Sequence, residues 1–206
     1  MARESPAPAG CASAAVFLFL VFFLPLFFMH VLAAAMDKLG MTPTTSLLIV
    51  FGIFAGSMIN IPVKRLPREE EVENRPPTMF GLERWFPRAE RRQSYTLIVV
   101  NVGGCLIPTA IAVYELSLLS ASGVRVLIGG LGAVGLNTAI CYWLARPVKQ
   151  VGIAMPPFVP AVVAAACGLL AGQEAGPPIA FAAGVVGPWV GADVLHLREI
   201  KEISAG

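Results

Sequence analysis

Residues 124–144, VRVLIGGLGAVGLNTAICYWL, decide the class of fold to which this chain belongs. This run carries a single charge, Arg125 near its start, and is otherwise largely apolar. About 20 such residues are enough for a helix to cross the hydrocarbon core of a bilayer. The whole chain agrees, because 56% of its 206 residues are hydrophobic and only 14% are charged, against about 25% in soluble domains. The composition therefore predicts an integral membrane protein.

Six runs of this kind occur along the chain, separated by short polar joints and by one long charged segment. The fold class that we predict is therefore all-α: a polytopic helical membrane bundle with six transmembrane helices. The predicted spans are residues 12–36, 44–63, 95–118, 124–144, 152–172 and 177–197. The corresponding divisions are a short N-terminus (1–11), helices 1 and 2 (12–63), a charged loop (64–94), helices 3 to 6 (95–197) and a tail (198–206).

The basic residues indicate the orientation of these spans, since cytoplasmic loops of membrane proteins carry an excess of Lys and Arg. With six spans, the N-terminus, the charged loop, the turn at 145–150 and the tail all lie on one side. That side holds 13 of the 15 Lys and Arg residues, and only Lys38 and Arg125 lie on the other. We therefore expect both termini in the cytoplasm and a location in the cytoplasmic (inner) membrane.

The first run has a second interpretation. Ala33–Ala35 could form a signal-peptidase site after an apolar segment. That segment, however, is longer than the roughly 7–15 residues of such a region. The only base ahead of it, Arg3, lies beside Glu4. The sequence therefore favours a retained helix over a cleaved signal.

The charged loop, residues 64–94, changes character along its length. Its first half, REEEVENRPP, is typical of disordered or extended chain. Its second half, MFGLERWFPRAERR, interleaves aromatic residues with arginines, which suits the lipid headgroup layer. We expect an interfacial segment that binds anionic lipid, and a docking site for a soluble partner is the alternative.

Two sequence features recur in alternate spans. The odd-numbered spans each have a proline after two apolar residues, and the even-numbered spans each have an amide or an acid after a glycine. Three parallel helical hairpins, related as repeats, would explain both features; chance similarity between short apolar segments is the alternative. The prolines are Pro25, Pro108 and Pro160, and the polar residues are Asn60, Asn137 and Asp193.

Asp193 raises the main question about function, because a carboxylate in an apolar helix is costly. At 1.5 Å per residue it lies roughly 6 Å inside the cytoplasmic end of its span, and three amides lie within about 10 Å of the same end. The fifth span enters there through three prolines, which remove backbone donors. The amides are Asn60, Asn101 and Asn137, and the prolines are Pro156, Pro157 and Pro160.

This convergence predicts a cytoplasm-facing cavity that binds an ion, a proton or a polar headgroup. We favour that role for Asp193, and hydrogen bonding between helices for the three amides. His196 shares a helix face with Asp193 and is a further candidate, although a histidine near the headgroups needs no role. Amides are poor metal ligands, so we expect no metal site. Glu115, toward the outer face, could pair with His30 or simply reach the interface.

Small side chains within the spans are expected to serve packing. Gly52 and Gly56 are four residues apart, as are Gly187 and Gly191, and such small-xxx-small patterns let helix backbones approach closely. The cysteines have no CxxC spacing, so we interpret them as small packing residues and not as disulfide partners or metal ligands. They are Cys11, Cys105, Cys141 and Cys167.

Four ordered segments resemble one known family. They are INIPV at 59–63, VNVGGCLIP at 100–108, GIAMPPFVPAVVAA at 152–165 and GPWVGADVLHL at 187–197. These segments are similar to domain-of-unknown-function family 1614, a group of small polytopic membrane proteins, from about the second span onward. The resemblance implies a helical membrane protein with Asn and Asp at the same positions, and it supplies no reaction.

A shorter motif, VGAD at 190–193, is similar to the Gly-x-Gly-Asp of intramembrane aspartyl proteases. Here Ala192 stands in place of the second glycine, and the only other candidate acid of this type, Asp37, lies in a joint on the other side. An aspartyl dyad needs two carboxylates that share a proton. These departures count against a protease.

Three functions remain open. We favour a small transporter, or an ion-binding or polar-ligand-binding membrane protein, with its site around Asp193 and working as a homo-oligomer. The first alternative is an intramembrane enzyme that acts on a lipid or peptide with Asp193 and His196 as acid and base. The second is a scaffold that recruits a partner through residues 64–94. The sequence has no ATP-binding loop or haem motif, so we expect no cofactor, and we expect no nucleic-acid partner.

Overall fold

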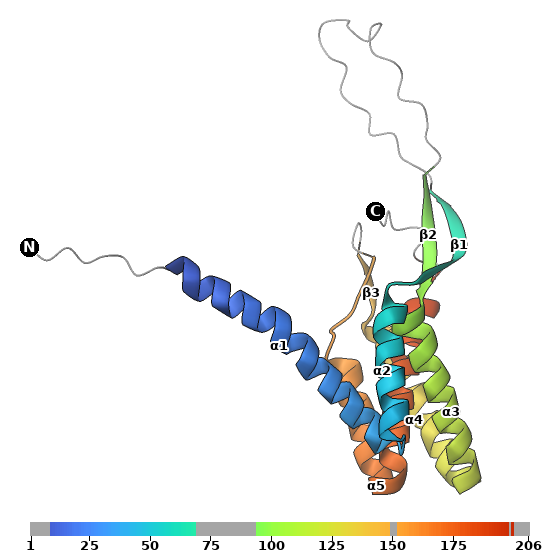
Figure 1. Ribbon diagram of the computed structural model, residues 1–206. Helices are drawn as coiled ribbons and strands as arrows, with labels where there is room; N and C mark the ends of the chain where they lie inside the picture. Colours follow the sequence, from blue (N-terminus) through green and yellow to red (C-terminus); the bar gives the residue numbers. More distant parts are fainter. Residues whose placement is uncertain (1–8, 69–93, 149–151, 198, 200–206) are drawn as a thin grey trace, which may run out of the picture. The chain divides into compact units, whose positions relative to one another are not determined.

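The computed structural model describes residues 9–68, 94–148, 152–197 and 199 (Figure 1). The chain divides into two compact units, residues 1–55 and 56–206. The predicted interfacial segment of the charged loop, which contains Trp85 and its neighbouring arginines, lies outside the described residues. The same holds for Lys149 and for nearly all of the predicted tail.

The first unit is helical. It contains α1 (Ala9–Lys38) and most of α2 (Pro43–Ser57). The end of α1 is closed by Gly40, whose φ is 73°, and by a hydrogen bond of 3.2 Å from the N–H of Met41 to the carbonyl of Met36. This is the Schellman arrangement, in which a glycine takes the left-handed conformation. Thr42 then caps α2 by accepting a hydrogen bond of 3.3 Å from the N–H of Thr45.

In the described part of the second unit, α3, α4 and α5 pack against one another, and Figure 1 shows them side by side. They are α3 (Ile107–Ser122), preceded by the π-helical turn η2 (Val102–Leu106), then α4 (Val124–Leu144), then α5 (Val159–Pro188), which continues into a second π-helical turn, η3 (Trp189–Val194). Gly123, with a φ of 128°, makes the tight turn between α3 and α4. The buried core between the helices is Leu119, Ala133, Ala164, Ile179 and Ala183.

Helix α5 reverses direction at Gly172, where the backbone leaves the helical region with a φ of 88° and a ψ of −178°. The residues on either side then pack against each other. A Cβ added to Gly168 would lie 2.7 Å from the Cβ of Ala180 and 2.7 Å from the carbonyl oxygen of Gly176. We therefore describe α5 as a first arm, residues 159–171, and a second arm, residues 173–188. The break predicted between the fifth and sixth spans corresponds to this reversal.

Within the described residues, four helical segments are long and apolar enough to cross a membrane: Val16–Lys38, Val102–Ser122, Val124–Leu144 and Val159–Val194. The last is longer than one crossing needs, because it includes both arms of α5. The shorter apolar helix Pro43–Ser57 is additional to these four. The helices therefore suit a multi-pass membrane protein, and their arrangement as three parallel hairpins stays a prediction.

Two stretches that we predicted to be helical are strands. Strand β1 (Asn60–Arg68) pairs antiparallel with β2 (Ser94–Asn101), so the predicted spans 44–63 and 95–118 were wrong over residues 60–63 and 95–101. Short apolar runs rich in Val, Ile, Thr and Tyr suit a strand as well as a helix, and periodicity does not separate the two. Pro62, which donates no ladder hydrogen bond, lies at a shift in the register.

The start of the predicted fifth span was wrong as well. Strand β3 (Arg146–Val148) pairs antiparallel with β4 (Gly152–Ala154), and α5 begins only at Val159. Pro156 and Pro157 precede the helix, and Pro160 lies in its first turn. A proline in the first turn loses no intrahelical hydrogen bond, because the N–H groups there have no partner within the helix. These prolines therefore begin a helix where we expected them to break one.

The close helix approach predicted for Gly187 and Gly191 is confirmed. A Cβ added to Gly187 would lie 2.8 Å from Nδ2 of Asn137, and one added to Gly191 would lie 2.8 Å from the Cβ of Cys141. The first contact joins the end of the second arm to α4, and the second joins η3 to α4. Only glycine leaves the backbones room to lie this close.

Candidate functional site

Asp193 lies on one of the two π-helical turns, η3, and a polar residue near it, Cys105, lies on the other, η2. Asp193 is on η3 and interacts electrostatically with Cys105, on η2, and with His196. Thr109 lies beside Cys105. We call these four residues the η cluster. Turns of π-helix are rare and occur frequently at functional sites, so their meeting here makes this end of the bundle the first candidate for a site.

The carboxylate of Asp193 is available to a ligand. Its side chain is exposed, although the residues just before it on η3, Gly191 and Ala192, are buried. It forms no hydrogen bond with the part of the chain that the structure describes. A carboxylate that is exposed and forms no hydrogen bond can bind a cation or a polar group without first breaking a hydrogen bond.

His196 is buried and held in place, whereas the sequence also allowed a solvated histidine near the headgroups. Its side chain is 4% exposed, and Nδ1 lies 3.0 Å from the carbonyl oxygen of Gly191. The imidazole also packs on Tyr142 of α4, with 4.7 Å between the ring centroids. His196 therefore fixes the end of η3 against α4, and it presents its charge or dipole to Asp193 from a defined position.

Thr109 adds a buried hydroxyl to the η cluster. Its Oγ1 is buried and has no hydrogen bond of good geometry within the described residues, although the thiol of Cys105 lies next to it. An unsatisfied buried hydroxyl costs about 1–3 kcal/mol. Such a cost is commonly accepted where the group serves a ligand, a water or a strained functional turn.

Asn137 does not belong to the η cluster. Its side chain is fully buried in α4, and Nδ2 donates hydrogen bonds of 2.8 Å to the carbonyl of Ala183 and 3.2 Å to that of Pro160. Its Oδ1 accepts a long hydrogen bond of 3.7 Å from the thiol of Cys141. Every hydrogen-bonding atom of the amide is engaged, so Asn137 acts as a link between α4 and both arms of α5.

Asn60 and Asn101 form a separate pair where the strands meet η2. They are opposite each other in the register of β1 and β2, and Nδ2 of Asn101 donates to Oδ1 of Asn60 over 3.0 Å and to the carbonyl of Ser57 over 2.7 Å. Oδ1 of Asn101 accepts a hydrogen bond of 2.6 Å from the N–H of Gly104. Asn101 therefore caps η2 and joins three segments of backbone.

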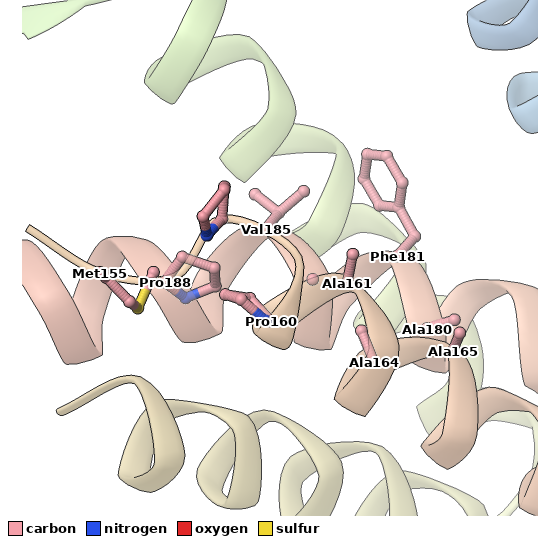
Figure 2. A pocket seen from close by; sticks show the side chains of 11 residues that line it. Met155, Pro160, Ala161, Ala164, Ala165, Ala180, Phe181, Val185 and Pro188 are labelled. Atoms are coloured by element: carbon pink, nitrogen blue, oxygen red, sulfur yellow. The ribbon is translucent and has the colours of Figure 1, made fainter. Parts of the chain in front are cut away.

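The three prolines named from the sequence have different positions. The carbonyl of Pro160 accepts the hydrogen bond from Asn137, and Pro157 and Pro160 line an apolar groove between the arms of α5 (Figure 2). Pro156 is in neither place. The structure therefore brings Asp193 and His196 together, and it places the three amides and the prolines at other points.

Glu115 is a buried acid that our sequence interpretation placed wrongly. It is 1% exposed, on the face of α3 that also carries Ile111 and Leu119, and its Oε1 has no hydrogen-bond partner among the described residues. It does not reach an interface. The signal in the sequence was its spacing of four residues from Ile111 and from Leu119, which places an acid within an apolar helix stripe.

Within the described residues, no three His, Cys, Asp or Glu side chains come together as a group that could hold a metal ion. The three cysteines whose side chains are described, Cys105, Cys141 and Cys167, are free thiols. The η cluster offers one carboxylate, one thiol, one hydroxyl and one imidazole. Such a set suits a proton, a monovalent cation or a hydrogen-bonding group better than a tightly held transition metal, which needs three or more strong ligands.

Comparison with known families gives one match. The family described as "Protein of unknown function (DUF1614)" matches residues 54–206. The chain belongs to this family. The matched region begins within α2 and includes the whole second compact unit, so all members of the η cluster and Glu115 lie within it. No curated protein and no solved structure matches the chain.

Proposed function

We propose that this member of the DUF1614 family is a small transporter, or an ion-binding or polar-ligand-binding membrane protein, whose site faces the cytoplasm and is centred on Asp193. In this proposal the chain crosses the inner membrane six times, counting α2 and the two arms of α5 as separate crossings, and both termini are cytoplasmic. The observation that carries it is the exposed Asp193 carboxylate on a π-helical turn, close to other polar groups.

The polar groups of α3 extend the site toward the middle of the bundle. Thr109 and Glu115 each have a buried oxygen without a hydrogen-bond partner among the described residues. They are six residues apart, or roughly 9 Å along the helix, and Thr109 belongs to the η cluster. Ionisable residues within membrane segments commonly mark ion and proton paths. Two buried oxygens without hydrogen-bond partners on α3, one of them within the η cluster, therefore support passage of a cation or proton more than binding at the surface alone.

An intramembrane enzyme is less well supported. A protease of the aspartyl type needs two carboxylates that share a proton, and neither Asp193 nor Glu115 has the other among its electrostatic partners. His196, the other candidate for acid-base chemistry, is buried against Tyr142 and bonded to Gly191. A general base must reach the proton that it removes, and this imidazole is poorly placed to do so.

The test is a flux measurement in proteoliposomes that contain a pH-sensitive dye, with a panel of cations outside. Wild type, Asp193→Asn and Glu174→Gln would be compared, since Glu174 is also an exposed acid but lies at the reversal of α5, away from η3. We expect flux from wild type and Glu174→Gln and none from folded Asp193→Asn. Wild-type flux in Asp193→Asn would remove Asp193 from the mechanism. No flux from any folded protein would favour the enzyme or scaffold alternative.

A second proposal concerns partners. Strands β1 and β2 hold the ends of the charged segment together, because Arg68 and Ser94 are partners in the register, and Figure 1 shows this strand pair extending away from the helices of the same unit. We propose that residues 69–93 recruit a soluble partner or anionic lipid. Replacing them with Asn-Gly, which suits a two-residue hairpin turn, should abolish capture and leave the bundle folded; surviving capture would contradict the proposal.

A further inference from the structure

An apolar groove of about 470 Å³ lies between the two arms of α5. Figure 2 shows Met155 at one end of this groove and Phe181 toward the other, where the short side chains of Ala164, Ala165 and Ala180 also lie. Its lining contains no charged or amide side chain. The volume lies within the range of roughly 300–1,000 Å³ that is usual for small-molecule sites.

The groove exists because small residues line both arms. Ala161 and Ala165 are one helical turn apart on the first arm and are exposed into the groove, and Gly184 faces Ala164 across its floor. Each of these alanines carries only a methyl group, which leaves space beside the helix. Toward the reversal the arms close on each other, because Gly168 and Gly176 lie in contact. The groove is therefore a channel along the bundle surface that is open on one side.

Met155, at one end of the groove, is one residue away from the strand partner of an arginine. Met155 directly follows Ala154, which pairs with Arg146 in the register of β3 and β4. The side chain of Arg146 is exposed and forms no ion pair or hydrogen bond with the described residues. Trp143, three residues earlier and 82% exposed, is at the end of α4. Exposed Trp residues concentrate at the level of the lipid headgroups, so Arg146 lies at the level of the lipid phosphates.

We propose that this groove binds one acyl chain of an anionic phospholipid, and that Arg146 binds its phosphate. A guanidinium group matches a phosphate through two parallel hydrogen bonds, and an alanine-lined channel accepts a flexible hydrocarbon chain without unsatisfied polar groups. The apolar groove and the charge of Arg146 together therefore fit one amphipathic molecule. The proposal does not rest on the transport function, because none of its residues belongs to the η cluster.

The test uses a phospholipid with a photoreactive group in its acyl chain, added to the full-length protein in nanodiscs. Ala165→Phe should fill the groove and lower crosslinking to the arms of α5 about tenfold, which corresponds to 1.4 kcal/mol of binding free energy. Ala166→Phe is the matched control, since Ala166 is also exposed but does not line the groove. It should crosslink as wild type does.

The headgroup is tested separately. Arg146→Gln should remove the preference for anionic over zwitterionic probes, whereas Arg125→Gln, at the opposite end of α4, should retain it. Unchanged crosslinking in Ala165→Phe would overturn the proposal. So would an absence of lipid crosslinks at the groove residues of the wild-type protein. A preference for anionic lipid that persists in Arg146→Gln would overturn the assignment of the phosphate to Arg146.

Discussion

The Nδ2 atom of Asn137 lies 2.8 Å from the backbone carbonyl oxygen of Ala183, across the interface between α4 and the second arm of α5. The same amide donates to Pro160 on the first arm. One buried side chain therefore joins three helical segments. It can do so because Gly187 has no side chain at the place where a Cβ would lie 2.8 Å from that nitrogen.

Asn137→Ala should destabilise the bundle. The substitution removes both donors and leaves a cavity, and we expect a loss of about 1–2 kcal/mol, since hydrogen bonds between membrane helices contribute up to about 1.7 kcal/mol. Unfolding of the purified protein in mixed micelles would measure it. Leu136→Ala is the control, because Leu136 is the adjacent residue of α4 but is exposed. Equal stability of the two variants would show that the amide contributes nothing.

Gly187→Ala and Gly132→Ala should change stability in opposite directions. A Cβ at position 187 would meet Asn137, so we expect a loss of about 1–3 kcal/mol from overpacking. At position 132, also in a helix, nothing lies within 4 Å, and alanine should add up to about 1 kcal/mol through its helix propensity. The same unfolding measurement compares them. A Gly187→Ala variant as stable as wild type would contradict the close approach of these helices.

The packing of Gly187 shows how much of the fold the sequence could predict. The small-xxx-small spacing of Gly187 and Gly191 predicted a close approach, because it depends only on helix periodicity. The helical character of 124–144 followed from length and composition. The strand pair at Asn60 and Asn101 could not be predicted, since its apolar β-branched residues suit a helix equally well, and only pairing with a segment about 40 residues away in the chain decides between the two.

The candidate site could be predicted only in part, because the sequence shows which residues are neighbours along one helix but not which residues of different helices meet. Asp193 and His196 are three residues apart, so any helical turn brings them together. Cys105 and Thr109 come from a different segment, and their place beside Asp193 depends on how α3 and α5 pack. Sequence spacing along one helix does not contain that information. Glu115 could have been found by reading it against Ile111 and Leu119, which share its helix face.

The proposed orientation predicts where single cysteines can be labelled from each side of the membrane. In a variant without the native cysteines, Glu174→Cys and Ser122→Cys should react with a membrane-impermeant maleimide added from the periplasmic side. Val148→Cys should react only from the cytoplasmic side, because the positive-inside pattern places Arg146 there. Intact cells and inverted vesicles would supply the two sides. Labelling of positions 148 and 174 from the same side would exclude the reversal at Gly172 as a membrane hairpin.

Glu115→Leu should make the protein more stable and less active. Its buried Oε1 has no partner among the described residues, and removing an unsatisfied buried polar group recovers about 1–3 kcal/mol. A residue kept at such a cost is expected to serve function, so flux in the proteoliposome assay should be lost although the bundle unfolds at a higher denaturant concentration. Glu174→Leu, at an exposed acid, should change neither quantity. A destabilised Glu115→Leu would mean that the carboxyl has a structural partner, and wild-type flux in a stabilised variant would remove Glu115 from the proposed path.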